Sequence, residues 1–102
     1  MTTKSANIAG GGKQTIGAAI GKTGVRARAV QLNASGAGCL IGGSEVDPGS
    51  ASPVVAATGF PVPSTRELYL PYSAIWTDMY EFDQMYVYVP NGVTLDLLYE
   101  QG

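Results

Sequence analysis

The sequence predicts an all-β protein, a small antiparallel β-sandwich or jelly-roll-like domain. Three observations support this class. The apolar residues alternate in short segments, the chain of 102 residues contains 14 glycines and 6 prolines, and only 14% of its residues are charged. Such a composition favours short strands and tight turns over helices. The length suits one domain with a single core. We expect residues 13–102 to form that domain and residues 1–12 to form a flexible N-terminal arm.

The predicted arm is polar and ends in three consecutive glycines. A segment of this composition cannot build a core. We therefore expect it to be an extended arm held by a neighbouring molecule; the alternative is that it docks on its own domain. The arm and the residue that follows it supply four predicted interface residues: Met1, Lys4, Ile8 and Lys13.

The first two predicted strands cover residues 14–20 and 25–33, joined by a turn at residues 21–24. In the second strand, the apolar residues occupy odd positions up to Ala29 and even positions from Val30. This change of phase predicts a β-bulge or a strand that changes partners. A third strand is predicted at residues 39–41.

The middle of the chain predicts less regular structure. Residues 45–57 should be loop, because Pro48, Gly49 and Pro53 disfavour a regular element. Residues 66–70 alternate, which predicts a strand with Leu68 and Leu70 on one side. Residues 73–82 are short and aromatic, and we expect an irregular connection with a helical turn.

The C-terminal part predicts a hairpin of residues 85–89 and 93–99 around Pro90-Asn91-Gly92. A three-residue loop would pair Val87 with Leu95 and create one aliphatic face. Tyr86 and Tyr88 would then lie beside Thr94, Asp96 and Leu98 on the opposite face. A two-residue loop would shift this register by one residue.

Charge is divided along the sequence. Residues 1–44 carry five cations and no acid, whereas residues 45–102 carry all eight acids and only one cation. Two interpretations remain open: association between copies, or pairing of basic with acidic strands inside one molecule. Dispersed cations in an acidic chain do not predict nucleic-acid binding.

Catalytic and cofactor motifs are weak. The chain has no histidine, so it lacks the usual general base. The segment from Gly17 to Thr23 imitates a phosphate-binding loop, but its glycines have the wrong spacing. Asp78, Glu81 and Asp83 suggest calcium, although they lack the spacing of an EF-hand loop, and we interpret them as a solvated acidic loop. The sequence predicts neither an enzyme nor a cofactor or metal site.

Location signals are also weak. No apolar run approaches the roughly 18 residues of a membrane span. The N-terminus lacks the apolar region of a secretion signal. Cys39 has no partner for an internal disulfide and is expected to fill the core. We therefore expect a protein made in the cytoplasm that binds no membrane.

Aromatic residues supply the remaining candidate site. All nine lie at Phe60 or later. Aromatic side chains dominate many interfaces because each buries a large area at low entropic cost. The predicted interface therefore also includes Tyr69, Trp76, Tyr80, Tyr86 and Tyr88.

Five segments together resemble a family of small virion proteins of tailed bacteriophages. They are VRARAVQLN (25–33), CLIGGSEV (39–46), TGFPV (58–62), RELYL (66–70) and the closing strand VTLDLLYEQG (93–102). The resemblance covers residues 25–102. The chain departs from the family pattern in an insertion-like loop at residues 47–58 and in the aromatic segment 73–82.

The resemblance implies a β-sandwich that forms part of the virion. We expect a capsid decoration (cement) protein on the capsid exterior, with the major capsid protein and further copies of itself, in a homotrimer, as partners. The alternatives are a receptor- or glycan-binding module carried on the tail or capsid, with Trp76 and Tyr80 in its site, or a structural component of the neck or tail.

Overall fold

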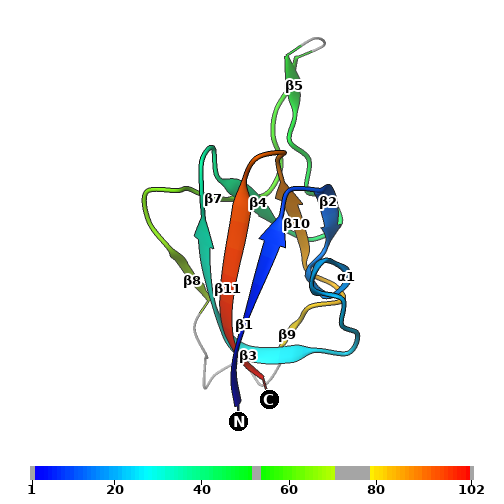
Figure 1. The fold of residues 1–102 in the computed structure, drawn as a ribbon. Helices are drawn as coiled ribbons and strands as arrows, with labels where there is room; N and C mark the ends of the chain where they lie inside the picture. The colour runs from blue at the N-terminus through cyan, green and yellow to red at the C-terminus, as the bar shows by residue number, and fades with distance from the viewer. Residues whose placement is uncertain (1, 52–53, 71–78, 102) are drawn as a thin grey trace.

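The computed structural model describes residues 2–51, 54–70 and 79–101 and confirms the all-β class. Its two main sheets are antiparallel and pack face to face as a small sandwich (Figure 1). The described elements are β1 (Thr2–Ala9), β2 (Gly12–Thr15), α1 (Ile16–Ile20), β3 (Arg26–Ala34), β4 (Cys39–Gly42), β5 (Ser50–Ala51), β6 (Val54–Val55), β7 (Phe60–Val62), β8 (Leu68–Leu70), β9 (Tyr80–Glu81), β10 (Tyr86–Val89) and β11 (Thr94–Gln101).

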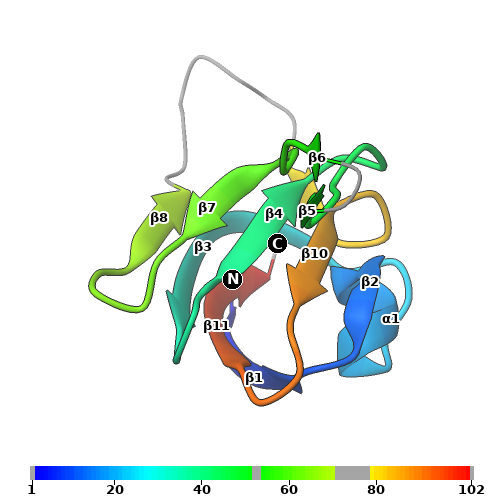
Figure 2. The same ribbon diagram turned by 90° about the horizontal axis from the view of Figure 1, so that it is seen from above.

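The five-stranded sheet has the order β1-β11-β3-β8, and β9 also pairs with β3. The four-stranded sheet has the order β2-β10-β4-β7. Seen from above, the two sheets face each other, and α1 lies beside β2 at one open side (Figure 2). Every described pairing in these two sheets joins a strand from residues 1–44 to one from residues 45–102. Basic and acidic segments therefore pair within one molecule, as the second interpretation of the charge division predicts.

The core lies between the sheets. Its largest fully buried side chains are Tyr99, Phe82, Ile8, Ile16, Leu32, Leu95, Leu97, Val30, Val46, Val62, Val87 and Val89. The Phe82 and Tyr99 rings meet edge to face with their centroids 4.9 Å apart. Aromatic rings prefer this arrangement because their positive edges meet negative faces. Cys39 is buried in this core, as the sequence predicts.

The N-terminal segment is a strand of the sheet rather than a free arm. All eight residues of β1 pair with β11, from Thr2 opposite Gln101 to Ala9 opposite Thr94. Ile8 is only 2% exposed and packs in the core. The polar composition of β1 is explained by its position, because an edge strand needs only a few inward apolar side chains. Hydrogen bonding along β11 then supplies the order that its composition does not predict.

The predicted C-terminal hairpin is wrong. Although the turn from Pro90 to Val93 is tight, β10 pairs with β2 and β4, whereas β11 pairs with β1 and β3. The chain crosses from one sheet to the other at this turn. Val87 and Leu95 are both buried, as predicted, but they belong to opposite layers of the core. Alternation identifies the buried face of a strand and does not identify its hydrogen-bonded neighbour.

The strand predicted at residues 14–20 is also only partly correct, because it ends at Thr15 and continues as α1. The Thr15 hydroxyl caps the helix by accepting a hydrogen bond from the Ala18 amide. Gly21 ends it in the left-handed conformation at φ 72°. Helical geometry buries Ile16 and leaves Ala18 exposed, whereas a strand would place both on one face.

The change of phase in β3 is confirmed. Ala27 pairs with Gln101 and Ala29 with Glu100, so Arg28 is the extra residue of a β-bulge. The strand also changes partners, since it pairs with β9 at its start and with β8 further along. The strands predicted at residues 39–41 and 66–70 are present as β4 and β8, and Leu68 and Leu70 are both half-buried.

The predicted loop at residues 45–57 contains a short hairpin. Ser50 pairs with Val55 and Ala51 with Val54. At the base of this hairpin, Asp47 and Thr58 exchange two backbone hydrogen bonds of 2.9 and 2.8 Å. We call the described residues 47–51 and 54–58 the projecting hairpin, because β5 and the segments beside it extend away from the sandwich (Figure 1). The molecule is accordingly elongated, measuring 45 × 25 × 25 Å.

Candidate interaction surfaces

The outer face of the five-stranded sheet exposes two large apolar side chains. Tyr69 is 58% and Leu98 is 46% exposed. They lie on either side of Gln31, which pairs with Leu98 on β11 and with Tyr69 on β8. Both line one shallow hollow of about 200 Å³. We call Tyr69, Gln31 and Leu98 the Tyr69–Leu98 patch. The solvent-exposed face of an antiparallel sheet typically carries polar side chains at such positions.

The outer face of the four-stranded sheet carries Tyr86 and Tyr88, both half-buried. The Lys13 ammonium lies 5.5 Å from the centre of the Tyr86 ring and donates a hydrogen bond to the Ser44 carbonyl. The Lys13 side chain thus lies over the Tyr86 ring and covers this part of the outer face. Tyr88 instead lines a hollow of about 380 Å³ with Leu40 and several prolines. The two tyrosines lie on the sheet opposite to Thr94, Asp96 and Leu98, contrary to the prediction that they share a face.

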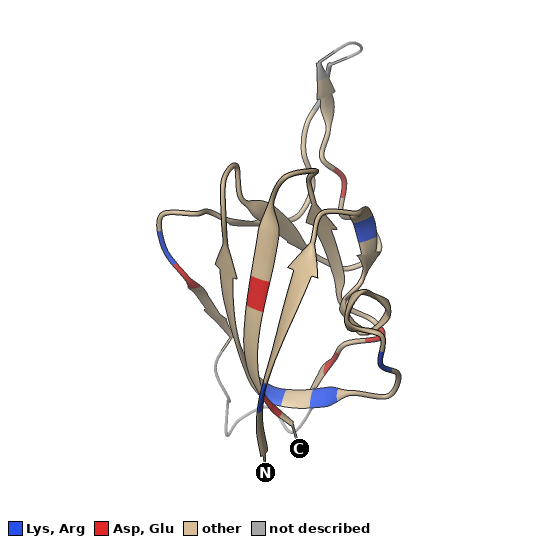
Figure 3. Cartoon of the chain, viewed as in Figure 1, with Lys and Arg blue, Asp and Glu red and all other residues tan. Residues whose placement is uncertain are grey.

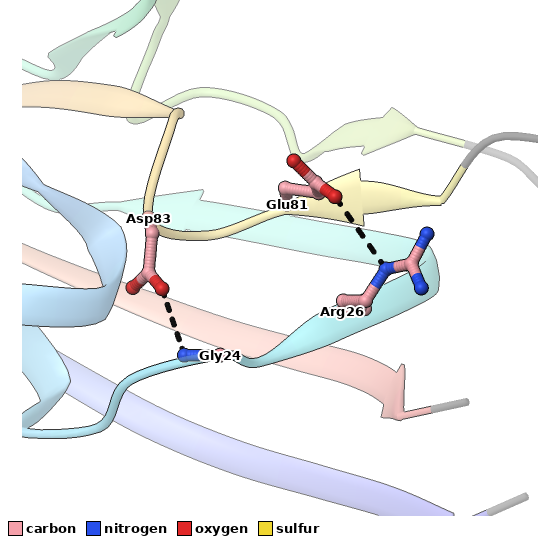
Figure 4. A network of polar contacts seen from close by, with 4 residues as sticks. All are labelled: Gly24, Arg26, Glu81 and Asp83. Atoms are coloured by element: carbon pink, nitrogen blue, oxygen red, sulfur yellow. Dashed lines mark hydrogen bonds and ion pairs between the residues drawn. The ribbon is translucent and has the colours of Figure 1, made fainter.

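A larger groove of about 880 Å³ opens between the two sheets. Its walls are mainly apolar and include Ile41, Phe60, Leu68, Leu70, Met79, Tyr80 and Met85. Phe60 is 61% exposed, the highest value among the large exposed apolar residues described. Two charged residues, Arg26 and Glu81, also line the groove. They form an ion pair in which Arg26 Nε and Glu81 Oε1 are 3.6 Å apart (Figure 4). Because the two charges neutralise each other, the groove favours an uncharged occupant.

The acidic residues weighed as a calcium site have separate structural roles. Glu81 pairs with Arg26, and Asp83 accepts a hydrogen bond of 2.7 Å from the Gly24 amide (Figure 4). Asp78 lies outside the described residues. Among the residues that the structure describes, no three histidine, cysteine, aspartate or glutamate side chains are close enough to hold a metal ion.

Charged residues are distributed over both sheets. Figure 3 shows basic segments in β1, β2 and β3, with acidic segments in β11 and in the loops around β8 and β9. The carboxylate of Asp96, in the middle of β11, accepts a hydrogen bond from the side-chain amide of Asn7 on β1. The charge pattern therefore gives no single basic or acidic face on which to place a partner.

The predicted interface residues do not form one site. Ile8 is buried in the protein's own core, so it is not available to a partner. Lys4 is exposed on β1, Lys13 and the tyrosines of β10 share one outer face, and Tyr80 lines the groove. Tyr69 is exposed on the outer face of the other sheet and also lines the groove, so the structure brings Tyr69 and Tyr80 together there. Met1 and Trp76 lie outside the described residues.

Phe60 and Leu98 are absent from the predicted interface. The sequence does place Leu98 on the face of its strand opposite Leu95 and Leu97, where the structure finds it. A leucine at a solvent-facing position of a strand is a readable signal. Phe60 gives no such signal, since its exposure depends on where the groove opens between two sheets.

The chain matches no family model, no curated protein and no solved structure. Among the described residues, no helix has the length and apolar character that crossing a bilayer requires.

Proposed function

We propose that this protein is a bacteriophage virion structural protein, most specifically a capsid decoration protein that binds the major capsid shell from outside and stabilises it. The observation that carries the proposal is the Tyr69–Leu98 patch. Tyr69 at 58% and Leu98 at 46% exposure, on either side of Gln31, form an apolar patch of the kind that partner proteins cover. The family resemblance of residues 25–102 suggests a virion shell as that partner.

The form of the molecule supports a structural role. The two-layer sandwich buries its apolar core and still leaves apolar side chains on its outer surfaces. An outer sheet face with exposed apolar side chains, such as the one that bears Leu98, suits docking on a broad protein surface. We propose that the decorating unit is a homo-oligomer, with a trimer as the expected form, because repeated copies strengthen binding to a repeating shell.

Co-sedimentation with capsids that lack this protein tests the proposal. We expect the wild-type protein to saturate such capsids and to raise the temperature at which they release DNA. Leu98→Asp should weaken binding by about tenfold or more, because it places a charge in a buried interface. Asn91→Asp is the matched control, since it adds the same charge on the exposed turn between β10 and β11.

Two results would contradict the proposal. The first is wild-type protein that stays at the top of the gradient with every capsid tested. The second is equal binding by Leu98→Asp and Asn91→Asp, which would exclude the Tyr69–Leu98 patch as the docking face. The folded state of each variant is checked independently by its urea unfolding transition.

A further inference from the structure

We infer that the groove between the sheets receives the projecting hairpin of a second copy of this chain. This inference does not rest on the proposed function, because it concerns a different partner and a groove that shares only Tyr69 with the Tyr69–Leu98 patch. It joins the two parts of the structure that the sandwich itself leaves unexplained. One is an open, mainly apolar groove, and the other is a hairpin that carries no charge beyond Asp47 at its base.

The hairpin is poorly supported within its own molecule. Its ladder consists of two residue pairs and the bridge between Asp47 and Thr58. A two-stranded hairpin of this size is marginally stable in water. It projects away from the sandwich, and residues 56–59 at its base are exposed (Figure 1). A partner that covers the hairpin would supply the missing stabilisation.

The composition of the hairpin indicates what kind of partner it fits. From Pro48 to Thr65 the chain has 18 consecutive residues without a charge, the longest such stretch in the sequence. The hairpin itself contains Val54 and Val55 among alanine, serine, glycine and proline. Small, uncharged residues can enter an apolar groove without the cost of burying an unpaired charge.

The groove has the matching properties. Apolar side chains line most of it, and its two charged groups, Arg26 and Glu81, neutralise each other. Its volume of about 880 Å³ exceeds that of several small side chains together. Phe60, at the entrance, is largely in solvent until the groove is filled. A second copy is therefore the occupant that the chain itself provides in a matching form.

The contact joins two different surfaces, a hairpin and a groove. Such a contact closes either by reciprocal exchange between two copies or around a ring of copies. Gly43 and Phe60 line the groove and also flank the base of the hairpin. Each copy can consequently give and receive a hairpin along the same side of the sandwich.

Sedimentation velocity of the full chain over a range of concentrations tests the inference. We expect the wild-type protein to self-associate, and Phe60→Asp to weaken association by about tenfold or more by placing a charge at the groove entrance. Asn91→Asp is the matched control, because it places the same charge at an exposed position outside the groove. It should associate like the wild type.

A second variant removes the hairpin. Asp47 and Thr58 are already paired, so an Asn-Gly turn between them would close the ladder without the residues in between. This shortened protein should fold and remain monomeric. Mixed with Phe60→Asp, it should form a heterodimer, because one variant keeps an intact groove and the other keeps an intact hairpin.

Three outcomes would overturn the inference. They are a wild-type protein that is monomeric at high micromolar concentration, a shortened protein that associates like the wild type, and a mixture of the two defective variants that forms no heterodimer. Loss of capsid or glycan binding in Phe60→Asp without any change in association would assign the groove to another partner. Failure of the capsid experiment leaves these measurements unaffected, so the two proposals can fail separately.

Discussion

At the scale of single residues, the structure depends on a few close contacts that alternation in the sequence does not report. Gly17 is buried where α1 meets the loop between β9 and β10, and its amide donates a 3.0 Å hydrogen bond to the Phe82 carbonyl. The neighbouring Asp83 carboxylate is fixed by the Gly24 amide. The glycine is required by this close approach and by no unusual backbone angle.

Gly17→Ala should lower the free energy of unfolding by about 1–3 kcal/mol, the range for overpacking a filled site. A Cβ at this position would collide with the Asp83 carboxylate and come within 2.9 Å of the Lys22 carbonyl. Gly11→Ala is the control, because the nearest atom there is the flexible end of Gln14 at 3.3 Å. Urea unfolding midpoints measure both; equal stability of the two variants would contradict the packing argument.

Burial makes Cys39 a poor nucleophile. Desolvation raises the pKa of its thiol from 9.0 to about 11. The native protein should therefore resist alkylation at pH 8, and the thiol should react only in urea, as mass spectrometry can show. Rapid modification of the folded protein would show that the thiol is accessible.

The same shift predicts a loss of stability in alkali. Between pH 9 and 11 the unfolded chain releases the thiol proton while the native protein retains it, so stability falls as pH rises through this window. The difference amounts to about 3 kcal/mol at its full extent. Cys39→Ala has no thiol to ionise. When the wild type and this variant are unfolded in urea at each pH, the stability of the variant should therefore fall less steeply.

At the scale of elements, β1 shows why local composition can mislead. Its residues are polar and glycines follow it, so the sequence predicts an arm. In the structure, its order comes from an unbroken ladder with β11 and from the burial of Ile8. Both depend on residues about 90 positions away, which no local pattern can report.

Deletion of residues 1–9 should abolish cooperative unfolding. It removes an edge strand, uncovers β11 and takes Ile8 out of the core. Replacing Ile8 alone with alanine should cost about 2–5 kcal/mol. Thr3→Ala, at an exposed position of the same strand, should cost much less. A truncated protein with a normal thermal transition would show that β1 is dispensable.

Element boundaries and burial were more predictable than strand pairing. The apolar phase of β3 predicts a bulge or a change of partner, and the structure has both; the predicted buried faces of β10 and β11 are also correct. The predicted pairing of β10 with β11 is wrong, because buried side chains such as Val87 and Leu95 can meet either as neighbours within a sheet or across the core between two sheets. The candidate site was predictable only in part: Tyr69 is exposed, whereas Ile8 is buried and Phe60 was missed.

At the scale of the whole molecule, the two halves of the chain interleave. A cut inside the projecting hairpin, between residues 52 and 53, separates the strands of every described pair in the two main sheets. Fragment 1–52 contains five cations and two acids, which gives it a formal charge of +3. Fragment 53–102 contains one cation and six acids, which gives it a formal charge of −5. Opposite charge should therefore assist their association.

We expect each fragment alone to lack a cooperative thermal transition, and an equimolar mixture to regain the transition of the intact protein. Circular dichroism of the separate and mixed fragments measures this. The rate of recovery should fall as salt is added, because attraction between exposed charges is screened. A fragment that folds by itself would show that the interleaved pairing is not required.

The position of β11 also bears on how the chain is synthesised. This strand, at residues 94–101, lies between β1 and β3 in the five-stranded sheet. A ribosome makes the chain from its N-terminus, so β1 and β3 exist long before the strand that joins them. Until β11 emerges, their unpaired edges and apolar faces are open to other nascent chains on the same messenger. Newly made protein can therefore close its own core only after residues 94–101 have left the ribosome.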